Sequence, residues 1–224
     1  MTPLSRVSIG PGETLRSTPK IVVLALAELS LLAVIGLSFW YQDLRYALPT
    51  PQPANWKAPS VGTRILLPAS LTSGSSRAPL ALNFYNSDCG CSRFNLDHLR
   101  QLYRSYGKKV RFILVLEGGS KSQEEATFQG LRLNCEHCCD TDGGLARDLG
   151  VYSTPQAAIL DSDLRLVYRG NYNVGRFCTD PRTEFARLAL ESVVSGRLLP
   201  AGLATVPAYG CAIPAFATSE SAFK

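Results

Sequence analysis

Histidine, tracts of biased composition and clustered positive charge are scarce in this sequence. Only two histidines are present, His98 and His137, so the second half of a zinc site is not evident. No low-complexity tract interrupts the chain, and 46% of its 224 residues are hydrophobic, which allows one globular domain of about 150 residues. The net charge of +5 is spread out without a basic stripe, so we expect no nucleic-acid partner.

Cysteine, by contrast, is abundant. Seven cysteines are more than an ordinary cytosolic enzyme carries by chance, and they indicate disulfides in an oxidising compartment, or metal. Because their number is odd, at least one thiol stays unpaired or pairs outside the chain. They are Cys89, Cys91, Cys135, Cys138, Cys139, Cys178 and Cys211.

A long apolar run lies near the N-terminus. Residues Ile21 to Tyr41 are mostly Ile, Val, Leu and Ala, and at ~1.5 Å per residue they span a bilayer core of roughly 30 Å. The run is longer than the apolar region of a cleaved signal peptide, so we predict a transmembrane anchor. Arg6, Arg16 and Lys20 precede it, which places the N-terminus in the cytoplasm and the rest of the chain outside it.

The apolar run divides the chain into segments. Glu28 lies inside the run and is either a tolerated polar residue or a contact with a partner membrane protein. Four prolines in residues 42–60 predict an extended linker. We therefore expect a cytoplasmic tail in 1–20, the anchor in 21–41, the linker in 42–60, a folded domain in 61–198 and an irregular tail in 199–224.

The domain alternates buried strand patterns with amphipathic helix patterns. Early strands separated by helices imply parallel pairing, and a late hairpin implies an antiparallel edge. The sequence therefore predicts an α/β fold with a mixed sheet and helices on both faces. The expected strands are 64–67, 80–85, 110–116, 156–160 and 164–168, the expected helices are 92–106, 122–130, 142–149 and 180–195, and residues 131–139 are ambiguous.

The strand at residues 80–85 leads into a turn that contains Cys89 and Cys91. A helix follows, so this thiol pair lies where unpaired N–H groups and the helix dipole stabilise a thiolate, the reactive form of cysteine. Cys89 and Cys91 are therefore the candidate catalytic residues. His98, further along the helix, need not face the thiols, and we expect it to be a surface histidine.

Three segments, in this order, resemble the thioredoxin-like superfamily. Phe84 to Cys89 is similar to its aromatic-rich strand and nucleophilic cysteine, Gly150 to Pro155 to the segment that carries its cis-proline, and Leu160 to Gly170 to the hairpin that follows. With the N-terminal anchor, the chain most resembles the membrane-tethered TlpA/ResA-like redoxins of bacteria. The resemblance implies a thioredoxin-like fold, a single-pass protein of the bacterial inner membrane with its domain in the periplasm, and no cofactor.

The resemblance also implies roles for individual residues. Cys89 is the nucleophile, and Thr154 and Pro155 present backbone groups to an extended substrate. The chain departs from the Cys-x-x-Cys pattern, because Ser92 stands at the second cysteine position and Cys91 lies between. A Cys89–Cys91 disulfide would close a small, strained ring that is readily reduced.

A second group of cysteines surrounds His137. Three thiols and an imidazole within residues 135–139 suit Zn²⁺ or Cu⁺, a second redox relay or structural disulfides, and these alternatives stay open. The resemblance to redoxin-like proteins implies that the C-terminal tail folds back on the domain, and Cys211 could then pair with Cys89 or Cys91. The candidates for a resolving or structural disulfide are Cys135, Cys138, Cys139, Cys178 and Cys211.

The leading functional hypothesis is a membrane-anchored thiol–disulfide oxidoreductase that acts on periplasmic protein disulfides through Cys89, with Cys91 or a remote cysteine as the resolving residue. Its partners are then protein thiols and disulfides, and the membrane through Ile21–Tyr41. No metal site is assigned to particular residues. Two alternatives remain: a copper- or zinc-binding module, and a non-enzymatic accessory subunit of a membrane complex.

Overall fold

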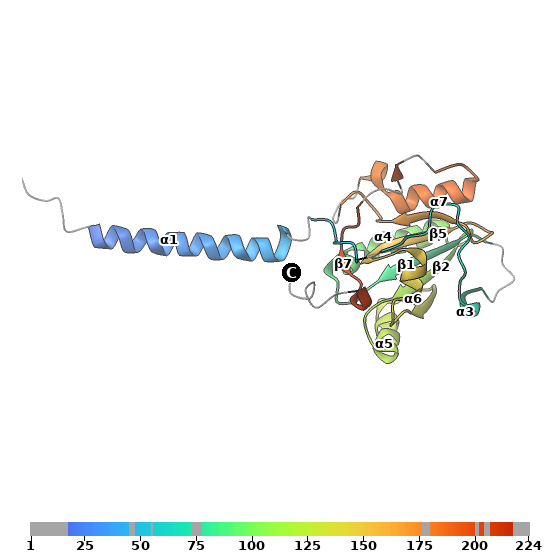
Figure 1. Cartoon of the computed structure of the whole chain (residues 1–224), viewed down its shortest axis with the longest axis horizontal. Helices are drawn as coiled ribbons and strands as arrows, with labels where there is room; N and C mark the ends of the chain where they lie inside the picture. The colour runs from blue at the N-terminus through green and yellow to red at the C-terminus, as the bar shows by residue number, and fades with distance from the viewer. Residues whose placement is uncertain are drawn as a thin grey trace, which may run out of the picture. The chain divides into compact units, whose positions relative to one another are not determined.

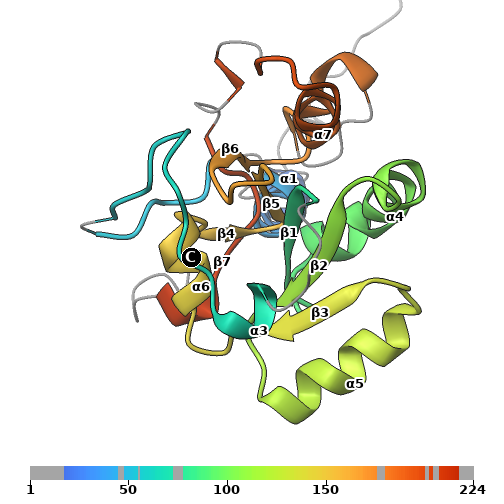
Figure 2. The ribbon, with the colours of Figure 1, turned by 90° about the vertical axis from the view of Figure 1, so that its right-hand side faces the viewer.

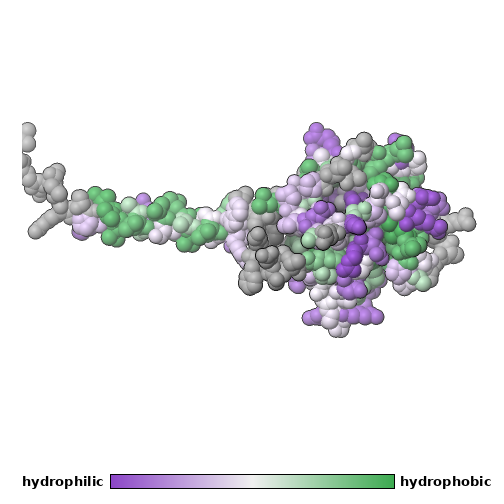
Figure 3. Space-filling model, viewed as in Figure 1, coloured by the Kyte–Doolittle hydropathy of each residue, from purple (hydrophilic) through white to green (hydrophobic). Residues whose placement is uncertain are grey.

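The computed structural model describes residues 18–44, 48–54, 56–72, 78–175, 180–199, 202–203 and 207–216. The chain divides into two units, residues 1–45 and 46–224 (Figure 1). The first unit contains helix α1 (Thr18–Phe39), which continues into the π-helical turn η1 (Trp40–Leu44). Pro19–Gln42 contains an 18-residue stretch with a mean hydropathy of 2.5 and is long and apolar enough to cross a membrane. The surface of α1 is accordingly mostly hydrophobic in Figure 3.

The second unit is built on a five-stranded sheet with the order β3-β2-β1-β5-β6. The central strand β1 pairs in parallel with β2 and antiparallel with β5. All six residues of β1 are buried, because the strand has a neighbour on each edge and cover on each face. The strands are β1 (Leu80–Tyr85), β2 (Arg111–Leu116), β3 (Glu136–Cys139), β5 (Gln156–Leu160) and β6 (Leu166–Gly170).

Helices cover both faces of this sheet. α4 and α7 pack on one face and α6 packs on the other, as Figure 2 shows. α5 lies beside β3 and begins with a reciprocal capping box between Ser120 and Gln123. The helices are α3 (Ala69–Thr72), α4 (Gly90–Tyr106), α5 (Lys121–Leu131), α6 (Gly144–Leu149) and α7 (Phe185–Ser195).

Alternation along the strands separates two hydrophobic clusters. Tyr85, Leu114 and Ile159 point toward α4 and α7, whereas Leu82 and Val115 point toward α6. Each cluster therefore takes every second residue from the same strands. This two-sided burial explains why β1 and β2 are continuous apolar runs in the sequence.

The architecture confirms the expected α/β, thioredoxin-like fold. A parallel β1–α4–β2 crossover is followed by the antiparallel pair β5 and β6, and the peptide bond between Thr154 and Pro155, just before β5, is cis. The ambiguous residues 131–139 contain the edge strand β3, which pairs in parallel with β2.

Two expected elements differ from the structure. Residues 64–67 do not form a strand, since Arg64 makes a single antiparallel bridge with Arg165 and Pro68, which lacks an N–H donor, follows soon after. The expected helix 180–195 is divided into the 3₁₀ turn η2 (Pro181–Thr183) and α7. Glu184 separates the two because its backbone, with φ −73° and ψ 76°, is not helical.

The C-terminal segment corrects the sequence prediction, which expected residues 199–224 to form an irregular tail. Within it, β7 (Cys211–Ala212) pairs antiparallel with β4 (Ser153–Thr154), and η4 (Pro214–Phe216) follows. Ile213 is fully buried, and its N–H donates to the Tyr152 carbonyl at 3.1 Å. Residues 207–216 therefore belong to the domain. A strand of two residues has no periodic pattern that the sequence could show.

The expected linker, residues 42–60, also makes contacts with the domain. Thr50 is 7% exposed, and its N–H donates to the Ala208 carbonyl at 2.7 Å. The rings of Trp56 and Phe216 have their centroids 5.0 Å apart. Thr50 and Trp56 are therefore packed on the C-terminal segment, so this part of the expected linker is not a free spacer.

Replacing Ile213 with alanine tests whether the C-terminal segment is part of the core. Truncation of a buried aliphatic side chain costs ~2–5 kcal/mol, so Ile213→Ala should lower the free energy of unfolding by about that amount in urea denaturation. Leu198 is 96% exposed, and the control Leu198→Ala should change the stability by less than about 0.5 kcal/mol. Equally small effects of both substitutions would contradict the packing of this segment.

Candidate active site

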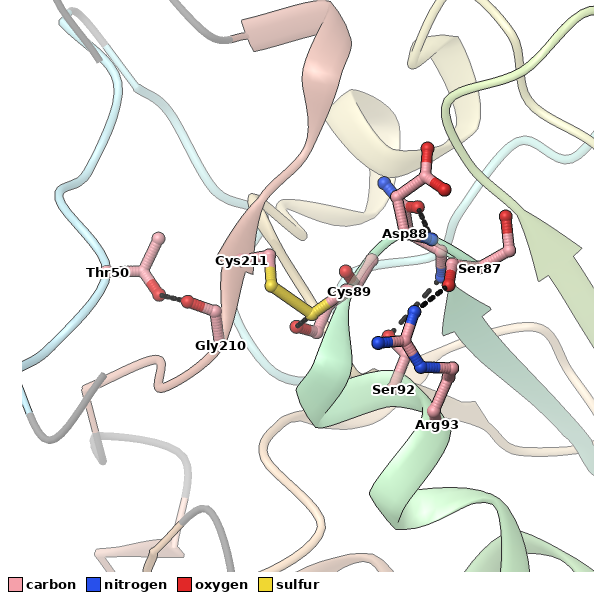
Figure 4. The surroundings of a disulfide bond; sticks show 10 residues. Thr50, Ser87, Asp88, Cys89, Ser92, Arg93, Gly210 and Cys211 are labelled. Carbon is pink, nitrogen blue, oxygen red and sulfur yellow. Dashed lines mark hydrogen bonds between the residues drawn. A yellow bond between two sulfur atoms is a disulfide. The ribbon is translucent and has the colours of Figure 1, made fainter. Parts of the chain in front are cut away.

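The turn between β1 and α4 fixes Cys89 at the start of a helix. The Cys89 N–H donates to the Asn86 carbonyl at 3.1 Å, and the Asp88 N–H donates to the Asn86 side-chain oxygen at 2.8 Å. Arg93 donates to the Ser87 carbonyl at 2.7 Å (Figure 4). Cys89 is the N-cap residue of α4, but its side chain caps no backbone group. Its sulfur therefore lies at the positive end of the helix dipole and has no role in capping the helix.

Ser92 stands where the resemblance places the second cysteine of a Cys-x-x-Cys pair. Its hydroxyl oxygen accepts a hydrogen bond from the Asn86 N–H at 3.3 Å, and the residue is 1% exposed. The serine therefore stabilises the turn that positions Cys89. Any disulfide partner of Cys89 must come from another position.

The cis peptide bond expected at Thr154–Pro155 is confirmed, and it lies beside the cysteine turn. The Thr154 carbonyl oxygen is 3.3 Å from the Cys89 sulfur. Ser153 and Thr154 are fully buried. β4, which precedes the cis-proline, therefore reaches the first turn of α4.

Cys211 is the disulfide partner of Cys89. The β7–β4 register places Cys211 opposite Thr154, and the disulfide joins residues 122 positions apart (Figure 4). Gly210 permits this approach, because a Cβ atom there would lie 2.1 Å from the Thr154 carbonyl oxygen. The Thr50 hydroxyl donates to the Gly210 carbonyl at 3.1 Å. The sequence left several partners open for Cys211, Cys89 and Cys91 among them, and the structure selects Cys89.

Cys91 completes a cluster of three sulfur atoms. The sulfurs of Cys89, Cys91 and Cys211 all lie within 4.8 Å of one another. Cys91 keeps its thiol and is 2% exposed. This proximity permits thiol–disulfide exchange among the three residues. In a fully reduced protein, three thiolates at this spacing would also suit a soft cation such as Cu⁺.

A groove of about 650 Å³ is lined at one point by Cys91. One wall is a face of α4, on which lining residues recur every three or four positions. The facing wall comes from Pro155, from the segment after β6 and from the C-terminal segment. The lining includes Cys91, Phe94, His98, Pro155, Tyr172 and Tyr209, but not Cys89 or Cys211.

His98 was expected at the surface, and the structure places it, partly buried, in the wall of this groove. Its side chain is 18% exposed, and its ring meets that of Tyr172 edge to face with 5.8 Å between centroids. Burial lowers the pKa of His98, and Glu184, 4.0 Å away, offsets only part of this effect. The imidazole is therefore uncharged at neutral pH and gives the groove a neutral polar side.

The second cysteine group does not converge on one point. Cys138 packs against the α6 face of the sheet, whereas Cys135 and Cys139 pack against the opposite face. His137 is engaged with Glu125, at 2.8 Å between Nε2 and the carboxylate. Among the described residues, only the sulfurs of the Cys89 cluster approach one another closely enough to hold a metal ion. The alternative of a metal site at residues 135–139 therefore lacks the geometry.

Burial also keeps two thiols of this second group in the protonated form. Burial raises the pKa of Cys135 to about 11 and that of Cys138 to about 12, so both are protonated at neutral pH. Cys135, Cys138 and Cys139 all keep their thiols, so none of the three forms the structural disulfide with Cys178 or Cys211 that the sequence left open. Cys178 lies outside the described residues.

A buried carboxyl group lies directly after β2, and the sequence analysis did not identify it. Glu117 is 1% exposed, and its side chain lies next to that of Asp140. Burial, and then repulsion from Asp140, raises the pKa of Glu117 to about 10. The group is therefore neutral at pH 7. Its place at the end of an apolar strand was the only signal in the sequence.

A protein family matches most of the domain that carries this site. Residues 63–213 match the family described as Domain of unknown function (DUF6436). The chain belongs to this family. The family region begins just before the bridge at Arg64 and ends just after β7, so it includes the cysteine turn, the cis-proline and Cys211. No curated protein matches the chain.

Two solved structures share the fold of this family member. A hypothetical protein from Sinorhizobium meliloti is 19% identical, with a TM-score of 0.58, over 72% of this chain and 97% of that chain. An uncharacterized conserved protein from Geobacillus kaustophilus is 23% identical, with a TM-score of 0.57, over 74% of this chain and 97% of that chain. At these identities the likeness shows the fold alone.

Replacing Glu117 with glutamine tests the neutral state of its carboxyl group. Glu117 stays protonated to a pH of about 10 in the folded protein, whereas in the unfolded chain it ionises near its usual value of 4.5. The folded state therefore binds more protons between these values, and the free energy of unfolding falls as the pH rises. Glu117→Gln should remove this decline and be more stable than the wild type at pH 8 in thermal unfolding.

The control for this experiment is Glu136, whose pKa is lowered by a hydrogen bond from Arg111. Glu136→Gln should give no stabilisation at pH 8, because it removes a favourable ion pair. If Glu117→Gln is less stable than the wild type at pH 8, the buried carboxyl group is ionised and its negative charge is stabilised by its surroundings.

Proposed function

We propose that the protein is a thiol–disulfide oxidoreductase that acts on protein substrates through Cys89. The observation that carries this proposal is the Cys89–Cys211 disulfide at the first turn of α4, beside the cis-proline and next to Cys91, which lines a groove. A sulfur at a helix N-terminus is a good leaving group and a good nucleophile, because the helix stabilises its thiolate.

The chemistry proceeds by exchange of sulfur partners. In the reduced protein, the Cys89 thiolate attacks a substrate disulfide, a mixed disulfide forms, and one substrate thiolate leaves. Cys211 then attacks the Cys89 sulfur, which releases the second substrate thiolate and forms the Cys89–Cys211 bond. The substrate gains the two electrons that the protein loses. The reverse sequence oxidises a substrate dithiol.

Cys211 fits the resolving role better than Cys91 does. The pairing of β7 with β4 holds Cys211 against Thr154, next to the Cys89 sulfur. A bond between Cys89 and Cys91 would instead close a small, strained ring. Ser92, at the position where the resemblance expects the resolving cysteine, has no sulfur.

Substrate contacts are assigned to Pro155 and the groove. The main chain of Thr154 already pairs with Cys211, so an extended substrate cannot use it while β7 is in place. Pro155 lines the groove together with Phe94 and Tyr172. These apolar and aromatic surfaces are suited to an unfolded or flexible protein segment.

The proposal also includes the location of the protein in the cell. The apolar helix α1 is proposed to anchor the protein in the bacterial inner membrane, with the domain in the periplasm. Two observations support this: the basic residues that precede α1 and the disulfide in the domain, which favours an oxidising compartment.

Trapping of mixed disulfides tests the oxidoreductase proposal. A double variant, Cys91→Ser with Cys211→Ser, leaves Cys89 as the only sulfur of the cluster, so it should accumulate reductant-sensitive adducts with cellular proteins on non-reducing gels. Cys89→Ser should accumulate none. The control Cys135→Ser should behave as the wild type, because its thiol is buried on another part of the sheet. If the double variant forms no adducts and the wild type does not change the rate of insulin reduction, the proposed function is wrong.

Fractionation and protease access test the location. The full-length chain should stay in the membrane fraction after alkaline carbonate treatment, because α1 is long and apolar enough to span the bilayer. Protease added to spheroplasts should digest the domain, as expected for a periplasmic orientation. Protection of the domain until the cells are lysed would place it in the cytoplasm and reverse the predicted topology.

A further inference from the structure

The groove reaches one sulfur of the cluster and not the disulfide. Cys91 lines the groove, whereas Cys89 and Cys211 do not. Cys89 is 1% exposed, and β7 covers it on the side of β4. A substrate that enters the groove therefore contacts Cys91 before it can reach the Cys89–Cys211 disulfide.

The C-terminal segment is held in place without its disulfide. Ala208 is 1% exposed and accepts a hydrogen bond from Thr50, and Ile213 is fully buried. The Tyr209 N–H donates to the Asn171 side-chain oxygen at 3.2 Å. These contacts keep Cys211 beside the other two sulfurs when the Cys89–Cys211 bond opens. The C-terminal segment therefore holds the Cys211 sulfur in a fixed position in the cluster.

From this arrangement we infer that Cys91 exchanges with the Cys89–Cys211 bond and presents the disulfide to the groove. The Cys91 thiolate attacks the Cys211 sulfur, the Cys91–Cys211 bond forms, and Cys89 leaves as a thiolate. One disulfide is consumed and one is formed, so the step needs no oxidant or reductant. The proton lost by Cys91 is balanced by the one that Cys89 can take up.

Two physical arguments select the Cys211 sulfur as the point of attack. Attack there expels Cys89, whose thiolate is stabilised at the N-terminus of α4, and the more stable thiolate leaves faster. Attack on the Cys89 sulfur would instead close the strained Cys89–Cys91 ring. All three sulfurs lie within 4.8 Å of one another, so the attacking thiol is already next to the bond that it opens.

The exchange gives the oxidised protein a second form. That form has its disulfide at the groove and a thiolate at Cys89. A substrate thiolate in the groove can then attack the Cys91 sulfur and expel Cys211, and a second substrate thiol releases the substrate disulfide. This last step rests on the proposed function, whereas the internal exchange does not.

Disulfide mapping of the full-length protein tests the exchange. Wild-type protein is equilibrated in a glutathione redox buffer, quenched with acid, unfolded and alkylated, and the label is located by fragment-ion mass spectrometry. We expect two isomers, one labelled at Cys91 and one at Cys89. In Cys89→Ser, oxidised glutathione should drive complete formation of the Cys91–Cys211 bond, because these sulfurs are already close.

Two further variants serve as controls for the disulfide map. Cys91→Ser should lose the Cys89 label completely, and Cys135→Ser should leave the wild-type map unchanged. Cys89→Ala replaces Cys89→Ser if the latter has a lower melting temperature than the wild type. A wild-type map with Cys89–Cys211 alone, or a Cys89→Ser protein in which Cys91 and Cys211 end as separate glutathione adducts, overturns the inference. Neither readout uses a substrate, so failed trapping with a two-isomer map would overturn the proposed function alone.

Discussion

The backbone at Gly210 approaches the Thr154 carbonyl so closely that no side chain fits between them. This contact allows β7 to pair with β4, and the pairing in turn brings Cys211 to the start of α4. The other contacts of the C-terminal segment, including the burial of Ile213, support the same approach. A side chain at position 210 would separate the two strands and so remove the partner of Cys89.

The thioredoxin-like scaffold is thus used with an unusual set of cysteines. The cysteine turn and the cis-proline are where the fold places them, but Ser92 holds the turn instead of serving as a redox partner. The second sulfur comes from a strand at the far end of the chain. The disulfide therefore joins the first turn of α4 to the C-terminal segment, and the Gly210 carbonyl of that segment accepts a hydrogen bond from Thr50, which precedes the domain.

Local environment differs between the two groups of cysteines. Cys89 lies at a helix N-terminus, where a thiolate is stabilised, whereas burial raises the pKa of Cys135 to about 11 and that of Cys138 to about 12. Strand alternation adds to this, because it divides the second cysteine group between two faces of the sheet. The sequence contains seven cysteines, and the described structure brings three of them together in one cluster of sulfurs that is placed for chemistry.

The sequence by itself determined the elements whose signals are local. The apolar runs of β1 and β2, the helix after Cys89, the cis-proline at Pro155 and the apolar N-terminal helix all follow from periodicity, composition or a short resemblance. Only the tertiary structure decided the partner of Cys211, because 122 residues separate the two cysteines and a two-residue strand has no pattern of its own. The same holds for the neutral carboxyl group of Glu117, since burial and neighbouring charge arise only when distant segments pack together.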